Sequence, residues 1–452
     1  MLRKIIFGLI ILILILGGIL FFLFKYQEKR NPEVVNQPFS ERVSDIFPVF
    51  NNEKNNGDVS STTEEVGESI GIDITVSTTT ENERVVPRLR LISKDPVSGA
   101  TIIETTVSST TPDGKKFNQK VYVARFMDRA TGHVFDLAYN SNSKNKISNT
   151  TIPKIHEALF SRDAKTIITR FLSSDNEVIK TYSIALTDRI RNASTTPEEL
   201  MLKDAKLTLL PTNIKEVSLS PDKTKIAYLI NTNTGSKVVV SSLDGVTSAT
   251  VFESDLKQWL LSWQETGRIT LSTKPSGFSP GFSYLLNSGT GALSKIIGNK
   301  TGLTILSSTD LSYHLLGTGG QRPLLSIFNP KDQTETSLSL RTFPEKCTWG
   351  KTDKVSIFCF VPSNIENSTY PEGWYLGAIS FSDNLWNISA PTGQTNLISS
   401  PVSEAGAQID AINPILSNDD KYLIFTNKKD LSLWAIYLGG EKIIEATSTP
   451  RI

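Results

Sequence analysis

The sequence predicts an all-β chain, a seven-bladed β-propeller of four-stranded antiparallel blades. A turn signature built around Ser-Pro-Asp returns about every 50 residues. Short runs of β-branched and aromatic residues flank its copies, as expected for half-buried strands. Apart from an apolar N-terminal run, only a capping box at Thr196-Pro-Glu-Glu199 predicts a helix, a short one ending near Lys203.

The turn signature is clearest at Ser220-Pro221-Asp222. Proline presets φ for the first corner of a turn, and aspartate can accept a hydrogen bond from its own backbone two residues later. The signature therefore predicts a β-hairpin. A weaker copy of the turn is predicted at residues 262–265, and the remaining copies place these aspartates at turns: Asp113, Asp163, Asp222, Asp310, Asp353 and Asp419.

Each repeat contains room for four strands. After the turn at Asp222, apolar runs at residues 226–230, 238–240 and 250–252 are separated by two further turns, and residues 217–219 precede it. A unit of this size cannot bury its own apolar face, so stacked copies predict a closed ring. Seven copies predict seven blades, and six or eight would follow if a weak copy is misread. The longer gaps after Asp163 and Asp353 predict extra loops in the second and sixth units.

The pattern Ser-Pro-Asp-x-x-x-Ile-Ala-Tyr, which ends at Tyr228, resembles the repeat of TolB-like β-propellers, which are related to WD-type repeats. The resemblance covers roughly residues 86–440. It implies a protein that binds protein partners through its faces. The order of apolar segment, polar stretch and propeller also resembles uncharacterised membrane-anchored propellers of small-genome bacteria.

The N-terminal part predicts an anchor and a linker. Residues 5–24 are apolar apart from glycines, and about 20 helical residues span the ~30 Å hydrocarbon core. A cleaved signal peptide is the alternative, although its apolar region is usually about 7–15 residues. The predicted division is a cytoplasmic tail (1–4), a transmembrane anchor (5–24), a flexible polar linker (25–84), the propeller (85–442) and a C-terminal tail (443–452).

Positive charges near the anchor are almost balanced, so the orientation with the propeller outside rests on the short N-terminal tail and on the two cysteines. Cys347 and Cys359 bracket the turn at Asp353, which places them opposite each other on neighbouring strands. We predict a disulfide. The alternative is a pair of independent buried thiols.

The sequence offers little catalytic chemistry. Lys and Arg (47) balance Asp and Glu (46), so the electrostatic signature of nucleic-acid binding is absent. Ser279 lies in a Gly-x-Ser-x-Gly pattern, but Pro280 favours a plain loop over the strand-to-helix turn of a hydrolase. Three isolated histidines, His133, His156 and His314, form no metal set, and we predict no metal, no cofactor and no enzymatic activity.

The loop of the sixth unit supplies the candidate binding residues. Tyr370, Trp374 and Tyr375 lie in a stretch too rich in Pro and Gly for a central strand. Exposed aromatic side chains on a loop are candidate binding anchors, whereas the alternative for Trp374 is packing over a neighbouring blade. The resulting hypothesis is a monomeric, membrane-anchored, extracytoplasmic scaffold for an unidentified envelope protein. An envelope enzyme or ligand sensor that uses the central channel is the alternative.

Overall fold

The computed structural model describes residues 85–110, 116–173, 178–188, 202–212 and 214–440. The predicted anchor, the linker, the capping box at Thr196 and the turn at Asp113 lie outside these residues. Within the described residues, no helix is long and apolar enough to cross a membrane. Helices there are short: η1 (Pro344–Lys346), α3 (Glu372–Tyr375) and α4 (Pro401–Ala405).

Four consecutive sheets each contain four antiparallel strands in chain order. Short polar turns join strands whose apolar residues alternate with polar ones, which is the pattern of a β-meander. The strands are β10 (Ile214–Leu219), β11 (Lys225–Asn231), β12 (Ser236–Ser242), β13 (Ser248–Ser254); β14 (Trp259–Glu265), β15 (Arg268–Thr273), β16 (Pro280–Asn287), β17 (Leu293–Thr301); β18 (Thr304–Ser307), β19 (His314–Thr318), β20 (Leu324–Asn329), β21 (Thr334–Ser337); β22 (Cys347–Trp349), β23 (Ser356–Pro362), β24 (Asp383–Ser389) and β25 (Thr395–Ser399).

An eight-stranded sheet precedes them in the chain. Its two four-stranded halves are joined only where Ser148 pairs with Lys203 in parallel. Lys203, where the predicted helix was to end, begins a strand. The strands are β2 (Val97–Thr110), β3 (Lys116–Asp128), β4 (Val134–Ala138), β5 (Asn145–Ser148), β6 (Ile155–Phe160), β7 (Thr166–Leu172), β8 (Ile179–Asp188) and β9 (Lys203–Leu209).

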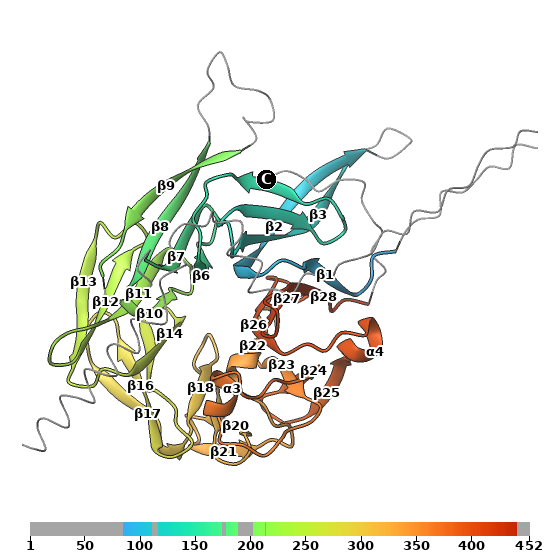
Figure 1. Cartoon of the computed structure of the whole chain (residues 1–452). Helices are drawn as coiled ribbons and strands as arrows, with labels where there is room; N and C mark the ends of the chain where they lie inside the picture. The colour runs from blue at the N-terminus through green and yellow to red at the C-terminus, as the bar shows by residue number, and fades with distance from the viewer. Residues whose placement is uncertain (1–84, 111–115, 174–177, 189–201, 213, 441–452) are drawn as a thin grey trace, which may run out of the picture. The chain divides into compact units, whose positions relative to one another are not determined.

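The last sheet closes the ring. The first strand, β1 (Leu89–Ser93), pairs with β28 (Leu433–Tyr437), which pairs with β27 (Tyr422–Asn427) and then β26 (Ala411–Leu416). Strand β26 contacts β22 of the preceding sheet and β2 of the first one. Figure 1 shows the sheets following one another around this ring, from blue at β1 to red at β28. The fold is therefore an all-β propeller with four-stranded antiparallel blades.

The core lies between successive sheets. Val97 and Ala124 of the first sheet pack with Ile424 and Leu433 of the last one in a single buried cluster. Similar clusters lie between the other neighbouring sheets. Burial of apolar surface stabilises the fold by about 25 cal/mol per Å², and here each sheet buries its face only against a neighbour.

The predicted turns have a common hydrogen-bond pattern. The Ser220 hydroxyl donates to Asp222 Oδ1 at 2.6 Å, and the Lys225 amide donates to Ser220 Oγ at 2.9 Å. The Ser220 and Thr224 hydroxyls hold the pKa of Asp222 below its usual value. The residue after the aspartate has a positive φ at four of these turns, at Ala164, Lys223, Leu311 and Asp420, with 54° at Lys223. The same serine–aspartate bond occurs at Asp163, Asp310 and Asp419.

Two of the weaker copies of the turn differ. At Asp353, glycine stands where the others have serine, and Asp420 of the next sheet accepts the amides of Lys351, Thr352 and Asp353 instead. Asp420 therefore links two sheets. The copy expected at residues 262–265 is wrong, since these residues belong to β14 and the turn follows Glu265.

Candidate functional site: the cap segment and the charges beneath it

The longest connection within the sixth repeat joins β23 to β24 and contains α3. We call residues 363–382 the cap segment. It holds Tyr370, Trp374 and Tyr375, all of the residues predicted for binding. It contains no strand, as its Pro and Gly content predicts.

The cap segment reaches connections of three other sheets. Glu372 accepts the Gly277 amide with both carboxylate oxygens, at 3.0 and 3.1 Å, in the β15–β16 connection. Tyr370 exchanges two backbone hydrogen bonds with Gly320 in the β19–β20 connection. Lys428, in the β27–β28 connection, donates to the Trp374 carbonyl at 2.8 Å. The cap segment therefore covers part of one face of the propeller.

Two glycines allow this close approach. A Cβ added at Gly319 would lie 2.1 Å from the Tyr370 carbonyl oxygen, and one at Gly277 would lie 2.6 Å from the same atom. Real Cβ atoms do not tolerate such distances from backbone. Gly319 and Gly277, the first glycine of the Gly-x-Ser-x-Gly pattern, are thus explained by packing under the cap segment.

An aromatic cluster lies beneath the cap segment. The ring of Trp374 stacks on Phe343 with centroids 5.0 Å apart and an interplanar angle of 8°. Tyr370 and Phe381 complete the buried cluster, and Ile412 of β26 packs against it. Burial of these rings holds α3 against Phe343, which precedes η1, and against Ile412 of β26.

Three charged side chains share this interior. Lys346 Nζ lies 2.7 Å from Asp383 Oδ2 and 2.5 Å from Asp410 Oδ1, and all three residues are buried. We call them the buried charge cluster. Each lies at the start of a strand: Lys346 directly precedes β22, Asp383 is the first residue of β24, and Asp410 directly precedes β26. Two carboxylates against one ammonium leave a buried excess of negative charge.

The cap segment donates to the buried charge cluster. Trp374 Nε1 lies 3.0 Å from Asp410 Oδ2, which also accepts the Phe381 amide at 3.1 Å and the Ser380 hydroxyl at 3.2 Å. The Lys346 ammonium lies 5.0 Å from the centroid of the Trp374 ring. Charge-assisted hydrogen bonds of this kind are about twice as strong as neutral ones.

Asp383 is the exception in this network. Its Oδ2 accepts the Ala411 amide at 2.7 Å, but Oδ1 is buried without a hydrogen-bond partner within the described part of the chain. Burial raises the pKa of Asp383 to about 6, against the opposing influence of Lys346. The protonated carboxyl group would relieve the excess negative charge.

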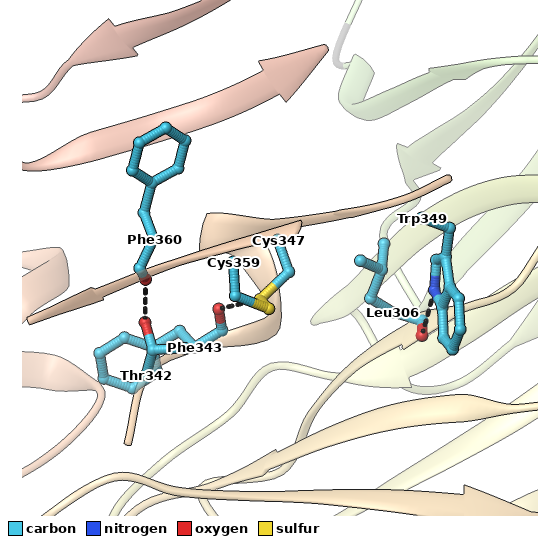
Figure 2. The surroundings of a disulfide bond; sticks show 7 residues. All are labelled: Leu306, Thr342, Phe343, Cys347, Trp349, Cys359 and Phe360. Carbon is cyan, nitrogen blue, oxygen red and sulfur yellow. Dashed lines mark hydrogen bonds between the residues drawn. A yellow bond between two sulfur atoms is a disulfide. The ribbon is translucent and has the colours of Figure 1, made fainter. Parts of the chain in front are cut away.

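The predicted disulfide is confirmed. Cys347 and Cys359 lie opposite each other on β22 and β23 and are bonded to each other. Figure 2 shows the bond beside Phe343, whose ring stacks on Trp374, and Thr342, whose hydroxyl donates to the Phe360 carbonyl at 2.6 Å. Because Lys346 directly precedes Cys347, the disulfide fixes the strand end that carries the buried lysine.

The expected exposure of the aromatic residues is wrong for Tyr370 and Trp374, which are buried. Trp374 is packed because Asp410, 36 residues later, satisfies its indole nitrogen and Phe343 covers its ring. Tyr375 is 37% exposed, and its hydroxyl donates to Glu345. The alternative reading, a tryptophan that packs over neighbouring structure, describes the observed side chain.

Two other apolar side chains are exposed around the cap segment. Leu376 follows α3 and is 83% exposed, and Phe278 follows Gly277 and is 80% exposed. Both lie within four residues of the hydrogen bonds between Glu372 and Gly277. A large apolar side chain held on a fixed loop is a typical feature of protein-binding surfaces.

The catalytic candidates are not assembled. Ser279 lies between two strands, β15 and β16, so the strand-to-helix context of a hydrolase nucleophile is missing. His314 is buried and its Nδ1 lies 2.9 Å from the Ser307 hydroxyl. Over the described ranges, no group of three or more His, Cys, Asp or Glu side chains could hold a metal ion.

Comparison with known proteins gives distant structural similarity only. No protein-family model and no curated protein matches the chain. Solved structures that resemble it include an oligogalacturonate lyase of Vibrio parahaemolyticus (11% identity, 75% of this chain and 99% of that one, TM-score 0.44) and TolB of Acinetobacter baumannii (9%, 76% and 81%, 0.38). The propeller domain of the Trilobed protease from Pyrococcus furiosus is also similar (11%, 80% and 98%, 0.43). Each of these similarities is distant and indicates no activity for this chain.

Proposed function

We propose that this chain is a membrane-anchored, extracytoplasmic propeller that binds a protein partner through the face carrying the cap segment. The observation that carries the proposal is the exposure of Leu376 and Phe278 on two loops that Glu372 ties together. Exposed apolar anchors on rigid loops gain affinity because little conformational entropy is lost on binding. We propose no enzymatic activity, in keeping with the unassembled candidates around Ser279 and His314.

Two features support the proposed location. The apolar run at residues 5–24 has the length of a transmembrane helix. The disulfide between Cys347 and Cys359 favours an oxidising compartment, because thiols are kept reduced in the cytosol. We therefore propose a single-pass anchor with the propeller outside.

The proposal includes seven blades. The eight-stranded sheet is counted as two blades, because a single parallel pair, Ser148 with Lys203, joins its halves. Together with the five four-stranded sheets this gives the seven units expected from the turn signatures.

Site-specific photocrosslinking tests the partner surface. A benzoyl-phenylalanine probe replaces Leu376 in the intact chain, in membranes of the cells that normally make it. The matched control places the probe at Val246, which is 79% exposed in the β12–β13 connection. The connections that meet the cap segment join the second and third strands of their sheets, whereas the turn with Val246 joins the third and fourth strands. Because antiparallel strands reverse direction at each connection, these two kinds of connection lie at opposite ends of a sheet.

We expect one discrete adduct from position 376, lost when Phe278→Ser is added, and none from position 246. Equal adducts from both positions, or none from 376, would refute the proposed surface. Protease protection in intact cells tests the orientation separately: a propeller digested only after the membrane is permeabilised would place it inside.

A further inference from the structure

A cavity of about 220 Å³ lies where the first and last sheets of the propeller meet. Its wall is mostly apolar and includes Ile424, Phe425 and Leu433 of the last sheet. Residues of β2 also line it, and Arg129, His156 and Asn413 contribute polar side chains to the wall. The cavity is smaller than the ~300–1,000 Å³ of drug-sized sites, so it suits a small ligand.

Bulges in two innermost strands shape this cavity. The pairing of β2 with β3 shifts between Val97 and Gly99. The pairing of β26 with β27 shifts between Ile412 and Ile415, where Asn413 has a φ of 53°. Bulges redirect side chains and are over-represented next to binding sites. Here they turn Asn413 toward the same space as residues of the first sheet.

The polar groups of the wall are poorly satisfied by the protein itself. Arg129 is the only Lys, Arg, Asp or Glu in the wall, and among the described residues its guanidinium makes one hydrogen bond, from Nη1 to the His156 carbonyl at 3.3 Å. It makes no ion pair with any residue the structure describes. The His156 imidazole and the Asn413 carboxamide likewise have no hydrogen-bond partner in that part of the chain.

We propose that this cavity binds a small carboxylate with an apolar body. The planar Arg129 guanidinium matches a carboxylate with two parallel N–H donors, and Asn413 offers a further N–H donor. Phe425 and Leu433 contact the apolar part. This site is separate from the cap segment and adds small-molecule binding to the proposed scaffold function.

Benzoate and its uncharged isostere benzamide test the proposal on the purified, intact chain in detergent. Titration by saturation-transfer NMR measures both dissociation constants. We expect benzoate to bind at least about tenfold more tightly than benzamide, because a charge-assisted hydrogen bond distinguishes them. Arg129→Met should abolish this preference, and Arg129→Lys should keep part of it.

Arg322→Met serves as the matched control, since Arg322 is an exposed arginine that contacts Asn367 of the cap segment. It should leave both affinities unchanged. The melting temperature of each variant shows whether it is folded. Equal binding of the two probes, an unchanged preference in folded Arg129→Met, or no benzoate binding up to about 10 mM would overturn the proposal. If inorganic phosphate bound as tightly as benzoate, the cavity would be a simple anion site. That result would refute the proposed contact of Phe425 and Leu433 with an apolar ligand body.

Discussion

Replacing Asp383 by asparagine should change how the stability of the propeller depends on pH. Asp383 is buried beside Lys346 and Asp410, and burial raises its pKa from 3.8 to about 6. The folded protein therefore binds this proton more tightly than the unfolded chain does. Between pH 4 and 6 the folded state holds more protons, so the contribution of Asp383 to stability falls as pH rises.

The magnitude follows from the shift. A difference of about two pKa units corresponds to roughly 3 kcal/mol, at about 1.4 kcal/mol per unit. This stabilisation is fully present below about pH 4 and lost above about pH 6. Asparagine cannot titrate, and its carboxamide oxygen can still accept the Ala411 amide. The free energy of unfolding of Asp383→Asn should therefore rise relative to wild type by roughly 3 kcal/mol between pH 4 and 7.

Urea denaturation followed by tryptophan fluorescence, at constant ionic strength and several pH values, measures this difference. Asp332→Asn, on an exposed turn, is the matched control for replacing an aspartate outside the interior. Taking wild type minus variant cancels the titration of groups that do not interact with Asp383. A flat difference for Asp383→Asn, or one of opposite sign, would refute the assignment of the raised pKa to this carboxyl group.

Three further predictions concern the same region. Lys346→Met should lower the free energy of unfolding by about 3–5 kcal/mol, because two buried carboxylates lose their cation. The control Lys300→Met removes a surface ion pair with Glu335 and should lower it by at most about 1 kcal/mol. Equal urea midpoints for the two variants would contradict this prediction. Thiol labelling of the unreduced protein should find no free cysteine, and the double variant Cys347→Ala/Cys359→Ala should lose about 3 kcal/mol for a loop of this length; two labelled thiols would disprove the bond. Asp410→Asn should speed hydrogen exchange at the cap-segment amides while strand amides stay protected; uniform protection would show that Asp410 does not hold the cap segment.

The strand-and-turn framework was predictable from the sequence because its signals are local. Asp222 and Asp419 bond a serine two residues away, and the disulfide follows from a hairpin that brings Cys347 opposite Cys359. The weak turn near Gln264 failed because the residues that resemble the signature belong to a strand. Where glycine replaces serine before Asp353, a carboxylate from the next sheet supplies the missing acceptor, which no local pattern reveals.

The candidate site was predictable only in part, because its contacts are long-range. The stretch around Trp374 was correctly placed in an irregular connection, but its burial depends on Phe343 and Asp410, which lie 31 residues before and 36 after it. The buried charge cluster was missed altogether. One signal was available: Asp410 stands between Ile409 and Ala411, both fully buried, where an aspartate is unexpected unless it has partners.

The presence of the buried charge cluster requires an explanation other than stability. Apolar residues of similar volume would hold the cap segment as well or better, because the desolvation of buried charges offsets much of their attraction. Burial of apolar area alone, however, is non-directional and does not by itself select one position of α3. Asp410 accepts the indole N–H of Trp374, the Phe381 amide and the Ser380 hydroxyl together only in one position of the cap segment. We therefore infer that the cluster fixes a single orientation of α3, and with it the direction of the exposed Leu376 side chain.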